Sequence, residues 1–155
     1  MSMLARDYFE SCVTYKQDLE RAKARLDAAR EGLDGLGHAN GLSMSVSGGC
    51  SSDAGDKFLA RINARDKALE RFTETANKLE DKLLEAMSII DKTGEDTNRH
   101  TGLWRSCLEY RYLQAMSIRE VASNVGMSCS SVQIALRNAL TWIDEHHLLD
   151  DIENV

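Results

Sequence analysis

Hydrophobic residues recur every three or four positions in two long stretches of the chain, which is the spacing of one face of an α-helix. The first stretch runs from about Met3 to Glu31, and its apolar seam is Tyr8, Cys12, Tyr15, Leu19, Ala22, Leu26, Ala29 and Leu33. The second runs from about Asp56 to Lys92, and its seam, interrupted at Arg65, is Phe58, Ile62, Leu69, Phe72, Ala76, Leu79, Leu83, Ala86 and Ile90. Heptad seams of this length predict two helices that pair as an antiparallel coiled-coil hairpin.

Between the two helices, residues 32–56 are rich in glycine and serine. Such a segment loses much conformational entropy when it becomes ordered, so we expect a flexible loop. Since the first helix is the shorter one, part of the second must bury its seam elsewhere. We therefore expect contact with the C-terminal part or self-association into a homo-oligomer, because a lone two-helix hairpin buries little surface.

A different pattern follows in the C-terminal third. Ser117 is a good N-cap, and Glu120 three residues later completes the signature of a capping box. Gly126 suits the left-handed backbone of a sharp turn, and Ser128 caps another helix. The inner stripe of that helix is Val132, Ala135, Leu136, Ala139, Leu140 and Ile143. Two short helices joined by a tight turn are the layout of a helix-turn-helix DNA reader, although ordinary helical bundles contain the same arrangement.

Composition supports an all-α fold, because the chain has no proline, few aromatic residues and many good helix formers. We expect a helical hairpin over residues 1–95 with the flexible loop 32–56, a three-helix helix-turn-helix module over 96–148, and an acidic tail over 149–155. The third helix is expected at about 98–114 and the reader helix at 128–147.

The net charge of −6 argues against a protein that coats nucleic acid nonspecifically. The charge is uneven, however. Residues 97–143 hold five arginines against Glu109 and Glu120, and the last twelve residues carry five acids. The proposed reader is therefore less acidic than the rest of the chain.

Chemistry for catalysis is missing from the sequence. Four cysteines (Cys12, Cys50, Cys107 and Cys129) lack metal or redox spacing, and Cys12 and Cys107 are expected to be packed thiols. Neither a nucleotide-binding loop nor a nucleophile–base arrangement is indicated. We expect that the protein is not an enzyme and that it binds no cofactor and no metal. With no signal peptide or membrane-spanning run, a bacterial cytoplasmic location is expected.

The C-terminal pattern resembles region four of bacterial sigma factors. The residues that carry the resemblance are Leu-Glu-Tyr-Arg-Tyr-Leu from Leu108, Met-Ser-Ile-Arg-Glu-Val-Ala from Met116, Gly-Met-Ser from Gly126, and the pair Ala139-Leu140. The chain as a whole is similar to ArpU-like phage transcriptional regulators, which join heptad helices to such a module. This resemblance implies double-stranded DNA as a ligand and leaves open a contact with host RNA polymerase.

Carried over position by position, the sigma-like base contacts fall on Cys129, Ser130, Ser131, Gln133, Ile134 and Arg137. The sequence departs from the family here, since sigma factors often place Arg, Glu or Lys at several of these positions. Gln pairs with adenine, Ser with either kind of base, and Ile134 with a thymine methyl. Arg119 and Arg137 are expected to hold phosphates. The predicted DNA-binding residues are therefore Arg119, Ser130, Ser131, Gln133, Ile134 and Arg137. This lean set suggests weak binding by one copy, and hence a dimer or a partner that supplies the missing affinity.

Three functions follow from this sequence. The first is a sequence-specific DNA-binding transcriptional regulator of phage or prophage origin. The alternative is a protein-interaction adaptor, in which the coiled coil docks on RNA polymerase or a phage component and no DNA is bound. A third is a structural coiled-coil protein with a vestigial module.

Overall fold

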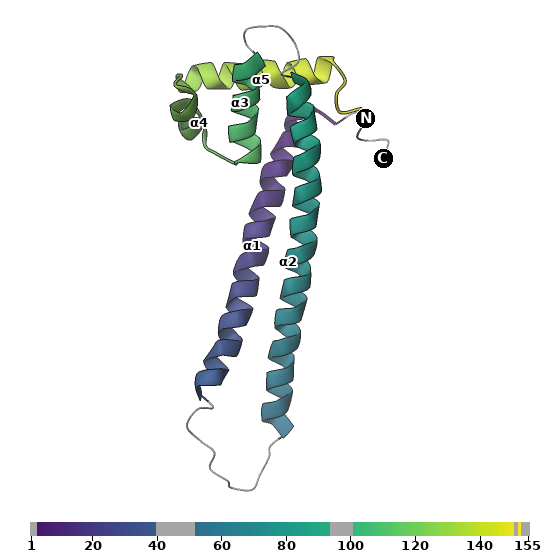
Figure 1. Cartoon of the computed structure of the whole chain (residues 1–155), viewed down its shortest axis with the longest axis vertical. Helices are drawn as coiled ribbons and strands as arrows, with labels where there is room; N and C mark the ends of the chain where they lie inside the picture. The colour runs from purple at the N-terminus through teal and green to yellow at the C-terminus, as the bar shows by residue number, and fades with distance from the viewer. Residues whose placement is uncertain (1–2, 40–51, 94–100, 151, 153–155) are drawn as a thin grey trace. The chain divides into compact units, whose positions relative to one another are not determined.

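The computed structural model describes residues 3–39, 52–93, 101–150 and 152. All regular structure in these residues is helical, and no strand occurs among them. The elements are α1 (Ala5–Ala39), α2 (Ser52–Thr93), α3 (Thr101–Leu108), the π-helix η2 (Glu109–Leu113), α4 (Ile118–Val125) and α5 (Cys129–Glu145) (Figure 1). The predicted all-α class is confirmed.

The bounds of the long helices differ from the sequence prediction. The expected end of the first helix at Glu31 is wrong, because α1 continues through Gly32 and Gly35 to Ala39. The second helix begins at Ser52 and not at Asp56. Both ends of the expected loop 32–56 are thus helical, and residues 40–51 lie outside the described residues. Glycine costs about 1 kcal/mol in a helix interior but, unlike proline, keeps the backbone N–H that continues the helix.

Residues 1–16 and 78–155 form one compact unit, unit 1, and residues 17–77 form another, unit 2. These units do not coincide with the segments 1–95, 96–148 and 149–155, since the start of α1 and the end of α2 pack with the C-terminal helices. The division of the chain into folding domains stays a prediction.

Unit 1 holds the main hydrophobic core. In it, α5 crosses α3 and the adjoining ends of α1 and α2 (Figure 1). The largest fully buried side chains of unit 1 are Tyr8, Phe9, Cys12, Ile89, Thr93, Cys107, Leu108, Val121, Val132 and Ile143. The Phe9 and Tyr112 rings pack with their centroids 5.5 Å apart. Cys12 and Cys107 are free and buried, which confirms the predicted packed thiols.

Polar contacts join α1 to α2 beside this core. The Tyr8 hydroxyl donates a hydrogen bond to Glu85 Oε2 at 2.8 Å, and Lys82 Nζ lies 3.6 Å from the centroid of the Tyr8 ring. Burial and the Glu85 carboxylate together raise the pKa of Tyr8 well above its usual range. The buried phenol is therefore held in its neutral form, with its polar atom satisfied.

The connection between η2 and α4 was not foreseen from the sequence. The expected helix over 98–114 is α3 followed by η2, in which Gln114 N–H donates to Glu109 O across five residues. Ala115 then takes the left-handed conformation at φ 56°, and Met116 N–H closes the turn on Tyr110 O at 3.0 Å. Lys16 Nζ donates to Gln114 O at 3.0 Å, so a cation lies at the carboxyl end of this helix.

The C-terminal residues partly close the core. After α5, His147 takes a left-handed conformation at φ 52°, and the chain continues in turns. Leu149 is buried, and Leu148 and Ile152 pack against the core. The start of the expected acidic tail is therefore anchored by apolar side chains, while residues 151 and 153–155 lie outside the described part.

In unit 2, α1 and α2 lie side by side (Figure 1). Leu26 is buried there, but Phe58 and Leu69 of the predicted seam are exposed, and Arg65, the expected interruption, is half-buried. The contact between the helices is thus shifted from the seam read from the sequence. No helix in the described part of the chain is long and apolar enough to cross a membrane.

Candidate nucleic-acid interface

The first helix of the candidate site, α4, begins with a complete capping box. Ser117 Oγ accepts a hydrogen bond from Glu120 N–H at 3.3 Å, and Glu120 Oε2 accepts one from Ser117 N–H at 2.7 Å. Hydrogen bonds from Ser117 lower the pKa of Glu120. The bond from the Ser117 backbone has the larger effect, and the bond from its side chain the smaller one. The capping box predicted from the sequence is confirmed.

The turn after α4 is set by one glycine. Gly126 lies at φ 69° and ψ 34°, the left-handed region, and Met127 N–H donates to Ala122 O at 3.0 Å. Two residues later Ser128 caps α5, and its Oγ accepts a hydrogen bond from Ser131 N–H at 3.1 Å. Both helix ends and the turn therefore follow local signals in the sequence.

The inner face of α5 is fully packed. Its six predicted core residues are all buried, namely Val132, Ala135, Leu136, Ala139, Leu140 and Ile143. They pack against α3 and α4 in unit 1. Because this face packs against the core, the opposite face of α5 is exposed. The helix ends at Glu145 and not at residue 147, since His146 is its C-cap.

Four exposed polar residues follow the opposite face of α5, which we call the outer ridge: Ser130, Gln133, Arg137 and Thr141. Their spacing of three, four and four residues places them on one side of the helix, over about 16 Å at 1.5 Å per residue. Three of the four were expected from the sequence. Thr141 was missed because the positions carried over from sigma factors end at Arg137, although helical periodicity alone points to it.

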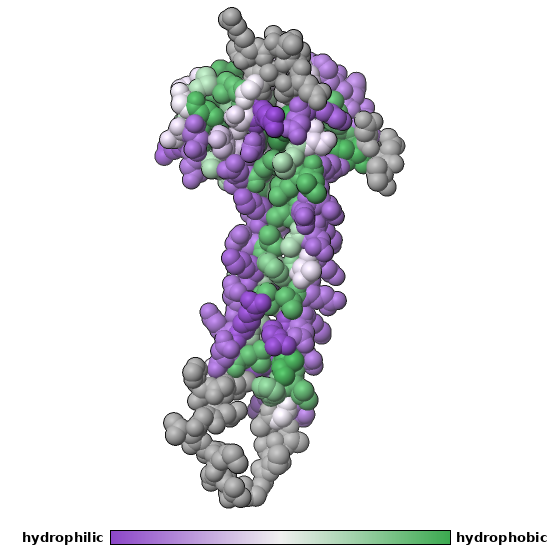
Figure 2. Space-filling model, in the orientation of Figure 1, coloured by the Kyte–Doolittle hydropathy of each residue, from purple (hydrophilic) through white to green (hydrophobic). Residues whose placement is uncertain are grey.

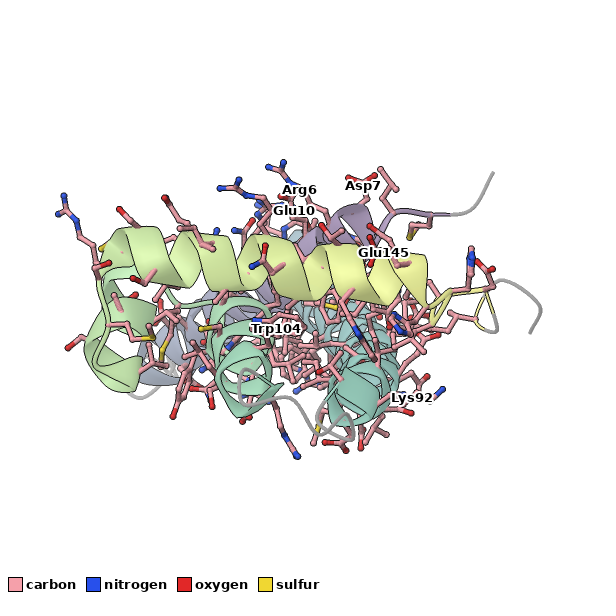
Figure 3. All side chains as sticks on the ribbon, turned by 90° about the horizontal axis from the view of Figure 1, so that it is seen from above. Arg6, Asp7, Glu10, Lys92, Trp104 and Glu145 are labelled. Carbon is pink, nitrogen blue, oxygen red and sulfur yellow. The ribbon has the colours of Figure 1, made fainter. Side chains whose placement is uncertain are left out.

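Two predicted contact residues lie beside the outer ridge and line a neighbouring groove. Ser131 Oγ lies 2.8 Å from Ser128 Oγ, so this hydroxyl already takes part in the helix cap. Ile134 lines an apolar groove of about 260 Å³ together with Leu103, Trp104, Met127, Ser131, Ala135 and Asn138. Figure 3 labels Trp104 on α3, the helix that α5 crosses. Ile134 is 52% exposed, so it is open to a ligand from the groove side.

The charges near the outer ridge are few. Arg119 is exposed in the first turn of α4, and Arg137 is exposed on the ridge. Residues 117–143 contain one further charged side chain, Glu120, and it is held in the capping box. Asp144 Oδ1 accepts a hydrogen bond from Ala5 N–H at 2.7 Å, so this carboxylate is directed to the start of α1. Glu145 lies near the carboxyl end of α5 (Figure 3). The amino-terminal part of the ridge is therefore the less acidic part.

No protein-family model, no curated protein and no solved structure matches the chain. In the part that the structure describes, no three His, Cys, Asp or Glu side chains gather closely enough to hold a metal ion. The function of this surface is therefore inferred from its geometry and chemistry.

Proposed function

We propose that the chain is a sequence-specific DNA-binding transcriptional regulator of phage or prophage origin. In this proposal α4 and α5 form a helix-turn-helix, α1 and α2 form an antiparallel coiled-coil hairpin, and α5 enters the major groove. The observation that carries the proposal is the outer ridge, an exposed polar face of α5 opposite a face that is completely buried. Bundle helices in general have polar outer faces, so the ridge supports the proposal through its position on the helix that follows the capped turn, which is the helix that contacts bases in helix-turn-helix proteins.

Each residue of this surface has a contact that suits its chemistry. Gln133 is suited to paired hydrogen bonds with adenine, and Ser130 to a hydrogen bond with either kind of base. Ile134, beside the ridge, is suited to a thymine methyl. Arg137 and Arg119 are suited to phosphates, which fix the register of the helix but carry no sequence information.

The small number of cations limits the affinity of one copy. The logarithm of the affinity falls with the logarithm of the salt concentration, with a slope of about 0.9 for each phosphate that the protein neutralises. Within residues 117–143, Arg119 and Arg137 are the only arginines or lysines that can neutralise a phosphate. A single copy is therefore expected to bind weakly. Two linked copies reach higher affinity because the second contact becomes intramolecular.

The test is a salt-titrated binding assay with fluorescent random-sequence duplexes and the full chain. The double variant Gln133→Ala/Arg137→Ala is expected to lose affinity about tenfold or more and to reduce the salt slope by about 1. Arg21→Ala is the matched control, because Arg21 is an exposed arginine on α1 with an ion pair to Asp18. Wild-type protein without salt-dependent affinity, or equal losses in variant and control, contradicts the proposal.

The groove beside Ile134 favours a second candidate, a protein-interaction adaptor. Leu103, Trp104 and Met127 offer an apolar slot that accepts a side chain of a partner protein, such as RNA polymerase or a phage component. Ile134→Lys separates the two functions. The added cation is expected to raise the affinity for random-sequence duplex DNA, where the phosphate contacts dominate and the thymine-methyl contact of Ile134 contributes little. In an adaptor it places a charge in the apolar slot and abolishes docking.

A further inference from the structure

Unit 2 leaves most of its hydrophobic side chains only partly covered. Among residues 17–35 and 55–77, Leu26 alone is buried. Phe58, Leu59 and Leu69 are 48%, 57% and 43% exposed. Two helices that pack only on each other cover one side of each helix, so the apolar residues beside the contact remain in water.

The exposed residues Phe58 and Leu69 and the half-buried residues Ile62 and Phe72 lie in one row, which Arg65 interrupts. Phe58, Ile62, Leu69 and Phe72 are spaced by four, seven and three residues, which puts them on one side of α2. Beside them is a groove of about 370 Å³ between α1 and α2, lined by Leu26, Arg30, Leu33, Asp34, Arg65 and Leu69. We call this surface the open stripe. Figure 2 shows hydrophobic side chains in a band along α1 and α2 with hydrophilic side chains on both sides.

A hairpin with this little burial needs a cover. Small domains bury a low fraction of their surface, and stable ones below about 70–80 residues add disulfides, metals or a partner. The heptad-like spacing of the open stripe is the spacing that receives knobs from another helix. The cover that fits is therefore helical and apolar.

The charges beside the open stripe favour a second copy of the chain as the cover. Residues 17–77 carry nine basic and ten acidic side chains, a net charge of −1. Nucleic acid or an anionic lipid surface is recognised by a strong positive excess, which unit 2 lacks. The groove presents both signs, with Arg30 and Arg65 next to Asp34. In a two-fold contact the groove faces the same groove of the other copy, so both signs of charge are available on each side.

We propose that two copies of the chain pack their open stripes together and form a four-helix bundle from the two α1–α2 pairs. This dimer goes beyond the proposed DNA binding and does not depend on it, because its residues all belong to unit 2. It would also carry two outer ridges.

The proposal is tested by light scattering on the full chain during size-exclusion chromatography. Wild-type protein is expected at twice the chain mass of 17.3 kDa. Phe58→Glu/Leu69→Glu is expected at the single-chain mass, because association weakens at least about tenfold when charges enter an apolar contact. The matched control is Leu84→Glu/Met87→Glu, which changes two residues of α2 outside unit 2 that are 60% and 49% exposed. It is expected to keep the dimer mass.

A second measurement needs no variant. The midpoint of thermal unfolding of the wild-type chain is expected to rise with protein concentration, as it does for a dimer that dissociates on unfolding. A wild-type monomer with a constant midpoint overturns the proposal, and so does a dimer that both double variants retain. A dimer without DNA affinity contradicts only the proposed function, and a DNA-binding monomer contradicts only the dimer.

Discussion

Asp144 and Ala5 are 139 residues apart in the sequence, yet Asp144 Oδ1 accepts a hydrogen bond from the backbone N–H of Ala5 at 2.7 Å. Ala5 is the first residue of α1, where N–H groups have no partner within the helix. The carboxylate near the end of α5 therefore caps α1 and places a negative charge at the positive end of the helix dipole.

We expect Asp144→Ala to lower the free energy of unfolding by about 1–2 kcal/mol, because it removes this cap and its charge. Glu145→Ala is the control, since Glu145 is exposed at the next position, and it is expected to change stability by less than about 0.5 kcal/mol. Urea unfolding followed by circular dichroism measures both. Equal losses would show that the hydrogen bond contributes nothing specific.

The capping box of α4 makes a second prediction. Ser117→Ala removes the acceptor for Glu120 N–H and is expected to destabilise the chain by about 1 kcal/mol. Ser123→Ala changes an exposed serine inside α4, where alanine is the better helix former, and is expected to be neutral or slightly stabilising. Chemical denaturation of the two variants gives the comparison, and the prediction is wrong if Ser117→Ala is the more stable of the two.

Ala115 carries backbone strain that glycine relieves. Its φ of 56° is unfavourable for a residue with a Cβ. Ala115→Gly is therefore expected to raise the free energy of unfolding by roughly 0.5–1 kcal/mol, and the midpoint of thermal unfolding with it. The same change at Ala24, exposed inside α1, is expected to cost about 1 kcal/mol or slightly less. The same substitution is thus expected to change the free energy of unfolding in opposite directions at Ala115 and Ala24. A loss of stability at both positions contradicts the inferred strain at Ala115.

Stability at alkaline pH follows from the buried thiol of Cys12. Burial raises the pKa of Cys12 from 9.0 to about 11, and burial also raises the pKa of Cys107 and Tyr112. Between pH 9 and 11 the unfolded thiol has lost its proton and the folded one has kept it. The unfolded state then binds fewer protons, so the free energy of unfolding falls as pH rises, by up to about 1.4 kcal/mol per pH unit for one group.

We therefore expect full stability from this group below pH 9 and a loss through the range up to about 11. Cys12→Ala removes the titrating thiol, so its stability is lower at neutral pH but declines less steeply above pH 9. Urea unfolding at a series of pH values measures the slopes. Parallel slopes for wild type and variant would mean that Cys12 ionises alike in both states.

Local features of the fold were readable from the sequence because short-range chemistry determines them. Ser117, Gly126 and Ser128 each have a residue type that suits one backbone role, and the structure places each in that role. The buried stripe of α5 was readable from periodicity, and it fixed the exposed face with Gln133 and Arg137.

Other features depend on the tertiary structure and gave no signal. The left-handed Ala115 has the best helix-forming residue type, and its turn is held by Lys16 and Arg111, which donate to the carbonyls of Gln114 and Met116. The glycines of residues 32–39 favoured a loop, but the helix continues through them. At the candidate site, the side-chain contact of Ser131 with Ser128 and the groove beside Ile134 depend on packing that spacing alone does not reveal.

The outer ridge as a reader of DNA sequence is tested most directly by selecting bound duplexes from a random pool with the full chain. The wild type is expected to enrich one motif, Gln133→Ala/Arg137→Ala to lose that motif, and Arg21→Ala to retain it. A folded wild-type chain that enriches no sequence, or a motif that survives the double variant unchanged, contradicts the account.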